Sequence, residues 1–378
     1  MRSLVQKFLY RKVEGRVIAH RSRFSGMFIG SPSICRLSGT HFLVSHDIFG
    51  PKSREFERPE THIWETTDAG MHWRRISVVV GAFWSRLFIH KGVLYLFGTN
   101  RHHGFLVIRR SVDGGVTWSE PKDEKSGLLR VGLFHMAPNP VVIHQGKIYI
   151  AIEFADGAVR EWGKRYGTCV ISVSLEADFL DATSWNFSPV LYYDSSYLQG
   201  CFGGWLEGSV ICGPDNMITT LLRVENDCSF VEKAALVRFD AINNTLLFNP
   251  ATDFVPFPGG SKKFSVLFDA ETSMYVALSN NISYIDHNIY ETEPDQIRNS
   301  VALIVSADLR SWKVVKVVVE TPQIERTAFQ YISFEFDGPD IIFVSRTAAP
   351  DLTFGARSYH DANFLTFHRI ENFRQYIE

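Results

Sequence analysis

The chain has 378 residues, of which 45% are hydrophobic and 21% charged, a composition typical of a folded protein. Its net charge of −2 lacks the basic excess that nucleic-acid binding needs, so no nucleic-acid partner is expected. No apolar run approaches the ~20 residues of a membrane helix, so no membrane partner is expected either.

Residues 1–12 carry charges without an uninterrupted apolar stretch, so they do not read as a signal peptide. We therefore expect a cytoplasmic protein as written, or a periplasmic or secreted one if a leader has been removed. The cysteines are odd in number and lack a Cys-x-x-Cys pair: Cys35, Cys169, Cys201, Cys212 and Cys228. Buried free thiols are expected, and a disulfide scaffold or a zinc site is not.

Strand-like apolar segments separated by turns recur along the chain, and the abundance of aromatic residues favours pleated sheets. Successive units of this kind span residues 31–82, 83–122, 135–193, 203–258, 260–320 and 327–375. The pattern predicts an all-β fold, a six-bladed β-propeller of four-stranded antiparallel blades, with seven blades as the alternative. We expect Val17–His20 to pair in the last blade and close the ring. No linker divides the chain, so residues 1–378 are expected to form one domain and a monomer.

A short motif occurs three times, at Thr66–Trp73, Ser111–Trp118 and, in a degraded form, Ser306–Trp312. Its best copy reads Ser-Val-Asp-Gly-Gly-Val-Thr-Trp. We call these segments the Asp motifs. The pattern predicts a tight turn in which the Asp carboxylate accepts backbone N–H groups and the Trp packs between sheets. The motif therefore indicates a fold rather than an activity.

Polar residues stand at two registers of the predicted blades, where loops meet on one face of a propeller. The starts of first strands carry Arg86, His135, Glu207, Lys263 and Gln330, and the ends of second strands carry His46, Arg101, His102, Arg223, Asn280 and Arg346. Arg165 precedes Tyr166, and His360 precedes Asp361. A carbohydrate site needs such a cluster, although some of these residues could simply end strands in solvated turns.

Chemistry divides these residues into two groups. The candidates for catalysis are His46, His135, Tyr166 and Glu207. The candidates for substrate binding are Arg86, Arg101, His102, Arg165, Arg223, Lys263, Asn280, Gln330, Arg346 and His360. Arginines from different blades could bind one carboxylate, or they could form ordinary ion pairs. The spacing of the histidines supports no metal site, so neither a metal nor a cofactor is predicted, and a structural or channel cation stays an open alternative.

The Asp motifs resemble the Asp-box (BNR) repeats of the sialidase-like β-propeller superfamily, and this resemblance covers nearly the whole chain. Sialidases open with Phe/Tyr-Arg-Ile-Pro, whose Arg binds the sialate carboxylate, but here the strand reads Gly30-Ser31-Pro32-Ser33-Ile34. Several blocks, among them Ser45-His46-Asp47 and the segment 135–140, resemble propeller enzymes that act on L-rhamnose-α-1,4-D-glucuronate termini. That second resemblance implies a histidine at the face of the ring, which His46 matches.

The function hypothesis is an exo-acting enzyme that cleaves a terminal linkage at or next to an acidic sugar of an oligosaccharide or polysaccharide. As a lyase it would use His46 as base and Tyr166 or His135 as proton donor. As a hydrolase it would use two of Asp47, Glu207 and Glu225. The alternatives are a sialidase-type hydrolase, a non-catalytic glycan-binding propeller and an interaction scaffold.

Overall fold

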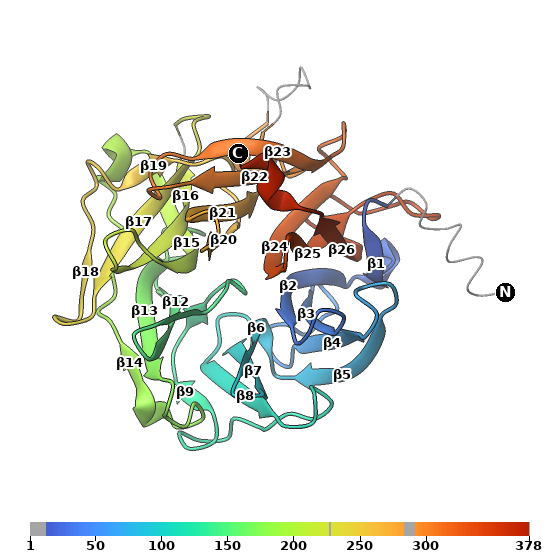
Figure 1. Cartoon of the computed structure of the whole chain (residues 1–378), viewed down its shortest axis with the longest axis horizontal. Helices are drawn as coiled ribbons and strands as arrows, with labels where there is room; N and C mark the ends of the chain where they lie inside the picture. The colour runs from blue at the N-terminus through green and yellow to red at the C-terminus, as the bar shows by residue number, and fades with distance from the viewer. Residues whose placement is uncertain (1–12, 227, 283–291, 378) are drawn as a thin grey trace.

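Six antiparallel sheets surround a central axis in the computed structural model of the chain (Figure 1). The structure describes residues 13–226, 228–282 and 292–377. The prediction of an all-β, six-bladed propeller is confirmed, and the alternative of seven blades is wrong. The segment 1–12, in which the sequence predicts no signal peptide, lies outside the described residues.

Each blade is numbered here by its order in the chain. The first contains β2 (Phe28–Arg36), β3 (Phe42–Phe49), β4 (Glu60–Thr66) and β5 (Arg74–Val80). The second contains β6 (Phe83–His90), β7 (Val93–Thr99), β8 (Leu106–Ser111) and β9 (Leu128–Arg130). The third contains β10 (Phe134–His135), β11 (Val142–His144), β12 (Lys147–Ala155), β13 (Tyr166–Ser174) and β14 (Trp185–Phe187).

The other three blades follow the same order. The fourth contains β15 (Phe202–Cys212), β16 (Ile218–Asn226), β17 (Lys233–Asp240), β18 (Thr245–Leu247) and β19 (Phe254–Pro256). The fifth contains β20 (Ser265–Asp269), β21 (Met274–Ser279), β22 (Ser300–Ser306) and β23 (Lys313–Glu320). The sixth contains β24 (Ala328–Asp337), β25 (Asp340–Ala348), β26 (Phe364–Ile370) and β1 (Arg16–His20).

The extra strand of the third and fourth blades is a split strand rather than an added layer. Both β10 and β11 pair with β12, and both β18 and β19 pair with β17. Each blade therefore keeps the predicted four positions from the axis to the rim.

Helical structure in the described residues consists of short 3₁₀ turns. They are η1 (Arg23–Ser25), η2 (Ala182–Ser184), η3 (Tyr197–Gly200), η5 (Pro294–Gln296) and η6 (Phe373–Tyr376). None of the helices in this part of the chain is long and apolar enough to span a bilayer.

Strand β1 closes the ring by pairing antiparallel to β26, as the sequence predicts. Val17 lies opposite Thr366, and His20 lies opposite Phe364. The seam between the sixth and first blades is filled by apolar side chains, among them Ile18, Phe42, Val44, Ile342 and Leu365. The ends of the described chain thus meet in one blade, which leaves no open seam in the ring.

The three Asp motifs form similar turns between the third and fourth strands of the first, second and fifth blades. In the second copy Asp113 accepts the N–H groups of Val116 (3.1 Å) and Thr117 (2.9 Å), and the Ser111 hydroxyl donates to it (2.8 Å). The indole N–H of Trp118 donates to a carbonyl of the turn, and Trp73 and Trp312 do the same in their copies. These bonds connect residues within one turn, between the two outer strands of a blade, so the motif stabilises that turn.

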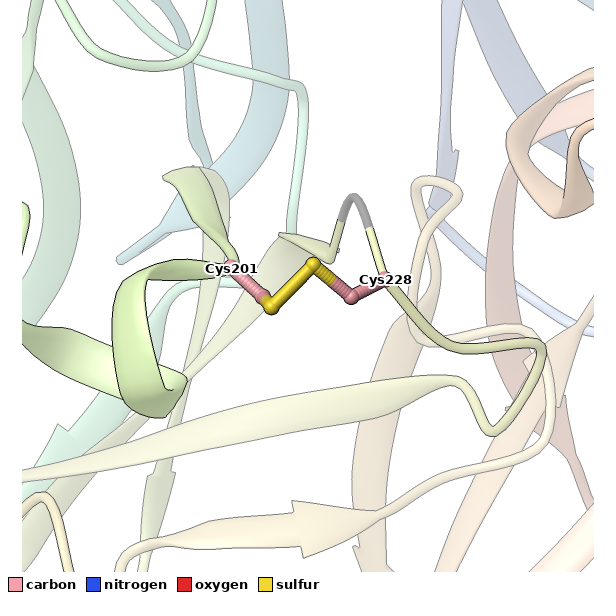
Figure 2. The surroundings of a disulfide bond; sticks show 2 residues. All are labelled: Cys201 and Cys228. Atoms are coloured by element: carbon pink, nitrogen blue, oxygen red, sulfur yellow. A yellow bond between two sulfur atoms is a disulfide. The ribbon is translucent and has the colours of Figure 1, made fainter.

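A disulfide joins Cys201 and Cys228 (Figure 2). The expectation that all cysteines are free thiols is therefore wrong for this pair, whereas Cys35, Cys169 and Cys212 are free. The reason is strand register, which the spacing of cysteines along the chain does not show. Phe202 in β15 lies opposite Asn226 in β16, so the residues that flank these strands are brought to a Cα–Cα distance of 5.5 Å.

We expect Asp113→Asn to lower the melting temperature near neutral pH. The hydroxyl and N–H of Thr117, with the Ser111 hydroxyl, lower the pKa of Asp113 to about 2. A lowered carboxyl pKa stabilises the folded state above the ordinary value of about 3.9, and this contribution is lost as the pH falls toward 2. The difference in melting temperature between wild type and variant should therefore shrink between pH 5 and pH 2. Val112→Ala, at an exposed neighbouring residue, is the control; a difference independent of pH would contradict this account.

Reduction of the Cys201–Cys228 disulfide should destabilise the protein, because it closes a loop with a sequence separation of 27. A cross-link of this length stabilises a fold by about 3 to 4 kcal/mol through the entropy of the unfolded chain. Chemical denaturation with and without reductant measures the effect, and a Cys201→Ser/Cys228→Ser variant should not respond to reductant. Thiol titration of the unreduced, denatured wild type should find three free cysteines. Five would overturn the assignment.

Candidate active site

The first strands of four blades share a β-bulge at one register. Their pairing with the second strand skips two residues, which are 30–31 in β2, 84–85 in β6, 207–208 in β15 and 331–332 in β24. Trp84, Glu207 and Tyr331 adopt left-handed backbone conformations there, with φ of 48°, 60° and 53°. Residues other than glycine rarely adopt this backbone conformation, and the strain that it causes is concentrated at functional sites.

The bulges of the fourth and sixth blades bring Glu207 and Tyr331 into contact. The Tyr331 hydroxyl donates to Glu207 Oε1 at 2.5 Å, although the two residues are far apart in the sequence. Arg223 in β16 donates to the other carboxylate oxygen at 3.0 Å and also contacts Glu225 at 3.4 Å. Glu207 and Arg223 are buried, whereas Tyr331 is partly exposed. A ligand can thus reach this group through Tyr331 and Glu225, which are partly exposed.

Two further arginines complete the surroundings of Tyr331. The Arg346 guanidinium lies 5.0 Å from the Tyr331 ring and 4.4 Å from the Phe49 ring. Arg298 donates to Gln330, the residue before Tyr331, at 2.9 Å. Both arginines are buried, and within the described residues neither forms a salt bridge with a carboxylate. The site therefore holds positive charge that no described carboxylate neutralises by direct contact.

The electrostatics of this group are consistent with a proton-accepting carboxylate beside a protonated phenol. Burial acts to raise the pKa of Glu207, but the charge of Arg223 and then that of His135 outweigh it, so the pKa is lowered. Burial, followed by the charge of Glu207, raises the pKa of Tyr331. At neutral pH Glu207 is ionised and can accept the proton that Tyr331 carries.

A second group of side chains lies on the second and third blades. His135 Nδ1 is 2.8 Å from Glu153 Oε2, and Glu153 Oε1 accepts the N–H of Gly208 at 3.1 Å. The His135 ring contacts Trp84 and Tyr166, with ring centroids 4.4 Å and 4.6 Å apart. His135, Glu153 and Tyr166 are all buried. Through the bond from Gly208, this group contacts the bulge that carries Glu207.

Histidine and aromatic rings continue this group toward solvent. The Tyr166 hydroxyl lies 2.8 Å from His103 Nε2, and burial raises the pKa of Tyr166. Burial, followed by the charge of His135, lowers the pKa of His103 to about 2. Trp162, which is 42% exposed, packs against His103 and Tyr166. His102 packs against Trp84 and Phe56 on the same side.

Arg86 and Lys263 lie in a buried layer that links inner strands. Arg86 donates to the Ser333 hydroxyl at 2.8 Å and to Glu335 at 2.8 Å. Lys263 donates to the Ser265 hydroxyl at 2.7 Å and to the carbonyl of Ile332 at 2.5 Å. Their partners are thus protein groups of the fifth and sixth blades, and a role in substrate binding stays a prediction.

His46 has different surroundings from the Tyr331–Glu207 pair. It is buried in β3, its Nδ1 lies 3.0 Å from the carbonyl of Asp47, and its ring packs against His62 and Trp64. Burial lowers the pKa of His46 well below its usual value. In the part of the chain that the structure describes, no hydrogen bond or ring contact joins His46 to Glu207, Arg223, Tyr331 or Arg346. Its predicted acid–base role stays a prediction, one that these surroundings do not favour.

Asp47 is buried beside His46, and its carboxylate binds backbone N–H groups. Its two carboxylate oxygens accept the N–H groups of Ser31 and Trp84, at 2.5 and 2.8 Å. Burial raises the pKa of Asp47 to about 7. This carboxyl group therefore links the bulges of the first and second blades.

Three more of the predicted residues, Gln330, Asn280 and His360, form hydrogen bonds to protein groups near the site. The Gln330 side chain accepts from Arg298, and the Asn280 amide donates to the carbonyls of Ser300 (2.7 Å) and Phe329 (2.6 Å). The His360 carbonyl accepts from Arg346 at 2.5 Å, and the exposed His360 imidazole lies 3.0 Å from Asp361 Oδ1.

Arg101 and Arg165 lie at the periphery of this region. Arg101 is exposed, with its guanidinium 5.8 Å from the Phe105 ring. Arg165 is partly buried, and its charge acts on His103 and Tyr166. Their roles in substrate binding stay predictions.

A cavity of about 360 Å³ opens beside Arg223. It is lined by Val224, Glu225, Asn226, Ser229, Glu232, Ser261, Glu293, Pro294 and Asp295.

Among the described residues, no group of three or more His, Cys, Asp or Glu side chains is arranged to hold a metal ion.

Two members of the site were not among the predicted site residues. Tyr331 was weighed only as a possible proton donor, since most of the many aromatic residues are expected in the core, and Arg298 was not considered. The signal for Tyr331 was its register, one residue after Gln330, but a bulge shifts that register and cannot be seen without the pairing. Arg298 lies in the connection between β21 and β22, just before β22, where no strand pattern places it.

The fold is a six-bladed β-propeller that several solved glycosidase structures share. Three solved structures illustrate the similarity. A protein of unknown function from Dyadobacter fermentans matches with a TM-score of 0.61 and 12% identity, over 96% of this chain and 99% of that one. The Penicillium chrysogenum α-L-arabinanase, solved with arabinobiose, matches with a TM-score of 0.56 and 13% identity, over 95% and 98% of the two chains.

The third is the Trypanosoma rangeli sialidase, solved with sialic acid. It matches with a TM-score of 0.56 and 12% identity, over 95% of this chain and 57% of that one. No protein-family model matches the chain, and no curated protein matches its sequence. At these identities the similarity establishes the fold, and the function has to be argued from the site.

Proposed function

We propose that this protein is a glycoside hydrolase that releases a terminal sugar carrying a carboxylate. The observation that supports this proposal is the 2.5 Å hydrogen bond between Tyr331 and Glu207 in the neighbourhood of Arg223, Arg298 and Arg346. Charge from all three arginines acts on the Tyr331 phenol. A nucleophile, its base and a group that binds anions are thus close together.

In the proposed reaction Tyr331 is the nucleophile. Its oxygen attacks the anomeric carbon as its proton passes to Glu207, and the leaving oxygen departs with a proton taken from solvent. Water then hydrolyses the tyrosyl–sugar bond and gives its proton to solvent, and the phenol recovers its own proton from Glu207. Sialidases also depart from the two-carboxylate scheme by using a tyrosine nucleophile. A neutral phenol has a physical advantage here, because a carboxylate nucleophile would repel the carboxylate of the substrate.

The arginines give the proposed preference for an acidic sugar. Arg223 is already paired with Glu207 and Glu225, whereas Arg298 and Arg346 have no carboxylate partner among the described residues. The longer-range charges of Asp295 on Arg298, and of Asp47 and Asp361 on Arg346, act against their burial. A buried charge without a contacting countercharge is costly, and a ligand carboxylate would supply that contact. Arginine is also suited to carboxylates because it can donate two parallel hydrogen bonds.

The comparisons are consistent with this proposal without deciding the substrate. One similar structure holds arabinobiose, a neutral disaccharide, and another holds sialic acid, an acidic sugar. Arg298 and Arg346, which no described carboxylate contacts, favour an acidic sugar over a neutral one as the substrate. A non-catalytic glycan-binding propeller would need the arginines but not a phenol held against an ionised carboxylate.

Tyr331→Phe and Glu207→Gln should each reduce turnover of 4-methylumbelliferyl glycosides of acidic sugars. The aryl group leaves without acid assistance, so this assay reports on the nucleophile and its base. We expect kcat to fall about 10²- to 10⁴-fold. In the wild type, kcat/KM should fall with decreasing pH only below about pH 4.3, because the pKa of Glu207 lies below its usual value.

The panel should contain a sialoside, a glucuronide and, as the neutral control, an α-L-arabinofuranoside. Hydrolysis of the arabinofuranoside alone would contradict the acidic preference. Absorbance near 235 nm from rhamnosyl-glucuronate substrates would instead indicate a lyase, because elimination leaves an unsaturated uronate and hydrolysis does not. Full activity in Tyr331→Phe would reject the nucleophile.

Arg346→Met should weaken binding of the acidic sugar more than it slows the chemistry. The variant keeps an unbranched side chain between Phe49 and Tyr331 but removes the charge. We expect KM for the acidic substrate to rise about tenfold or more, which corresponds to the ~1.5 to 3 kcal/mol of a charge-assisted hydrogen bond. Arg110→Met, at an exposed arginine in β8, is the matched control. Equal KM values for Arg346→Met and wild type would exclude Arg346 from the anion site.

A further inference from the structure

The bulges that carry Glu207 and Tyr331 leave backbone carbonyls outside the strand ladder. In β15 the pairing passes from Leu206 to Ser209, and in β24 it passes from Gln330 to Ser333. The carbonyls of the skipped residues are buried near the axis, where they need donors from elsewhere in the protein.

Asn139, from the third blade, supplies the donors for the Glu207 bulge. Its side-chain Nδ2 lies 2.8 Å from the carbonyl of Glu207 and 2.9 Å from that of Gly208. A primary amide is the neutral side-chain group that can donate to two carbonyls from one nitrogen. Pro138 and Pro140 flank Asn139 and restrict its backbone, so the amide is presented from a rigid segment.

Lys263, from the fifth blade, supplies the donor for the Tyr331 bulge, and Ser265 of the same blade connects Lys263 to Asn139. Lys263 Nζ donates to the carbonyl of Ile332 at 2.5 Å and to the Ser265 hydroxyl at 2.7 Å. The Ser265 hydroxyl lies 2.8 Å from the same carbonyl and 3.1 Å from Asn139 Oδ1, and because Lys263 already serves the carbonyl, its one proton can go to Asn139. All three side chains are buried, with at most 5% exposure, so water does not compete for these bonds. One continuous network therefore joins the two bulges from beneath.

We propose that Asn139, Ser265 and Lys263 are positioning residues that hold the Glu207 and Tyr331 bulges in register, and so fix the hydrogen bond between the two side chains. The third and fifth blades thereby set the relative position of groups on the fourth and sixth. The consequence for catalysis rests on the proposed function, but the effect on the Tyr331–Glu207 hydrogen bond does not.

The test uses protein labelled with ¹³C at the ζ carbon of tyrosine, whose chemical shift reports hydrogen bonding of the phenol. Tyr331→Phe assigns the Tyr331 resonance, and Glu207→Gln gives its position when the carboxylate is lost. Asn139→Leu, similar in size, should move the Tyr331 resonance toward the Glu207→Gln position. The matched control is Asn363→Leu, because Asn363 is an equally buried amide that donates to the Ala349 carbonyl at 3.0 Å. The control should lower the melting temperature without moving the resonance.

Activity gives the second readout. Asn139→Leu should lower kcat by about 10²-fold, the cost of misplacing reacting groups by about 1 Å, with little change in KM. Ser265→Ala, a smaller change, serves if Asn139→Leu fails to fold, and it should shift the resonance in the same direction. An unchanged Tyr331 resonance in the folded variant would overturn the proposal. If the wild type hydrolyses no glycoside of the panel, the proposed function fails while the resonance still decides the positioning role.

Discussion

The candidate site depends on a break in the hydrogen-bond ladder of the innermost strands. In a regular strand, successive side chains alternate between the two faces, and in a propeller both faces of an inner strand are covered by neighbouring blades. A bulge adds one residue and changes the direction of the side chains at that point. At Glu207 and Tyr331 the bulge coincides with a left-handed backbone, and the two side chains meet across the ring. The geometry of the site thus originates in backbone irregularity rather than in loop residues.

The second constraint on the site is its positive charge, which comes from a different blade than the sialidase resemblance implies. The sialidase resemblance implies an arginine near the start of the first blade, where this chain has Ser31 and Pro32. The structure places Arg346 of the sixth blade, the neighbour of the first, between Phe49 and Tyr331. A third positive charge is therefore present although the expected strand lacks it. In the proposed site, a positive charge therefore comes from the sixth blade, although the first strand of the first blade carries no arginine.

The fold was predictable because its signals are local. Apolar strand segments repeat at regular intervals, and the Asp motifs mark turns by the chemistry of a few adjacent residues, so neither requires knowledge of distant contacts. The positions of Arg223 and Arg346 were also predictable from the sequence, since both stand at the end of a second strand. In the structure each pairs with the inner strand just before its bulge. The Tyr331–Glu207 contact was not, because a bulge is a property of the pairing between strands. The Cys201–Cys228 disulfide was missed for a related reason, since only the register of β15 and β16 brings these residues together.

The pairing of β1 with β26 has a consequence for the synthesis of the protein. Strand β1 emerges from the ribosome early, but roughly 340 residues separate it from its partner. At ~5–20 residues per second, β1 has to wait on the order of 20 to 70 s before β26 exists. During this time Val17 and Ile18 lack the strand that β1 pairs with in the folded protein, and an unpaired apolar segment can pair with other chains. A nascent chain that stalls before β26 would keep that segment unpaired and leave the sixth blade incomplete. The arrangement that closes the finished ring thus makes translation speed and chaperone access part of its folding.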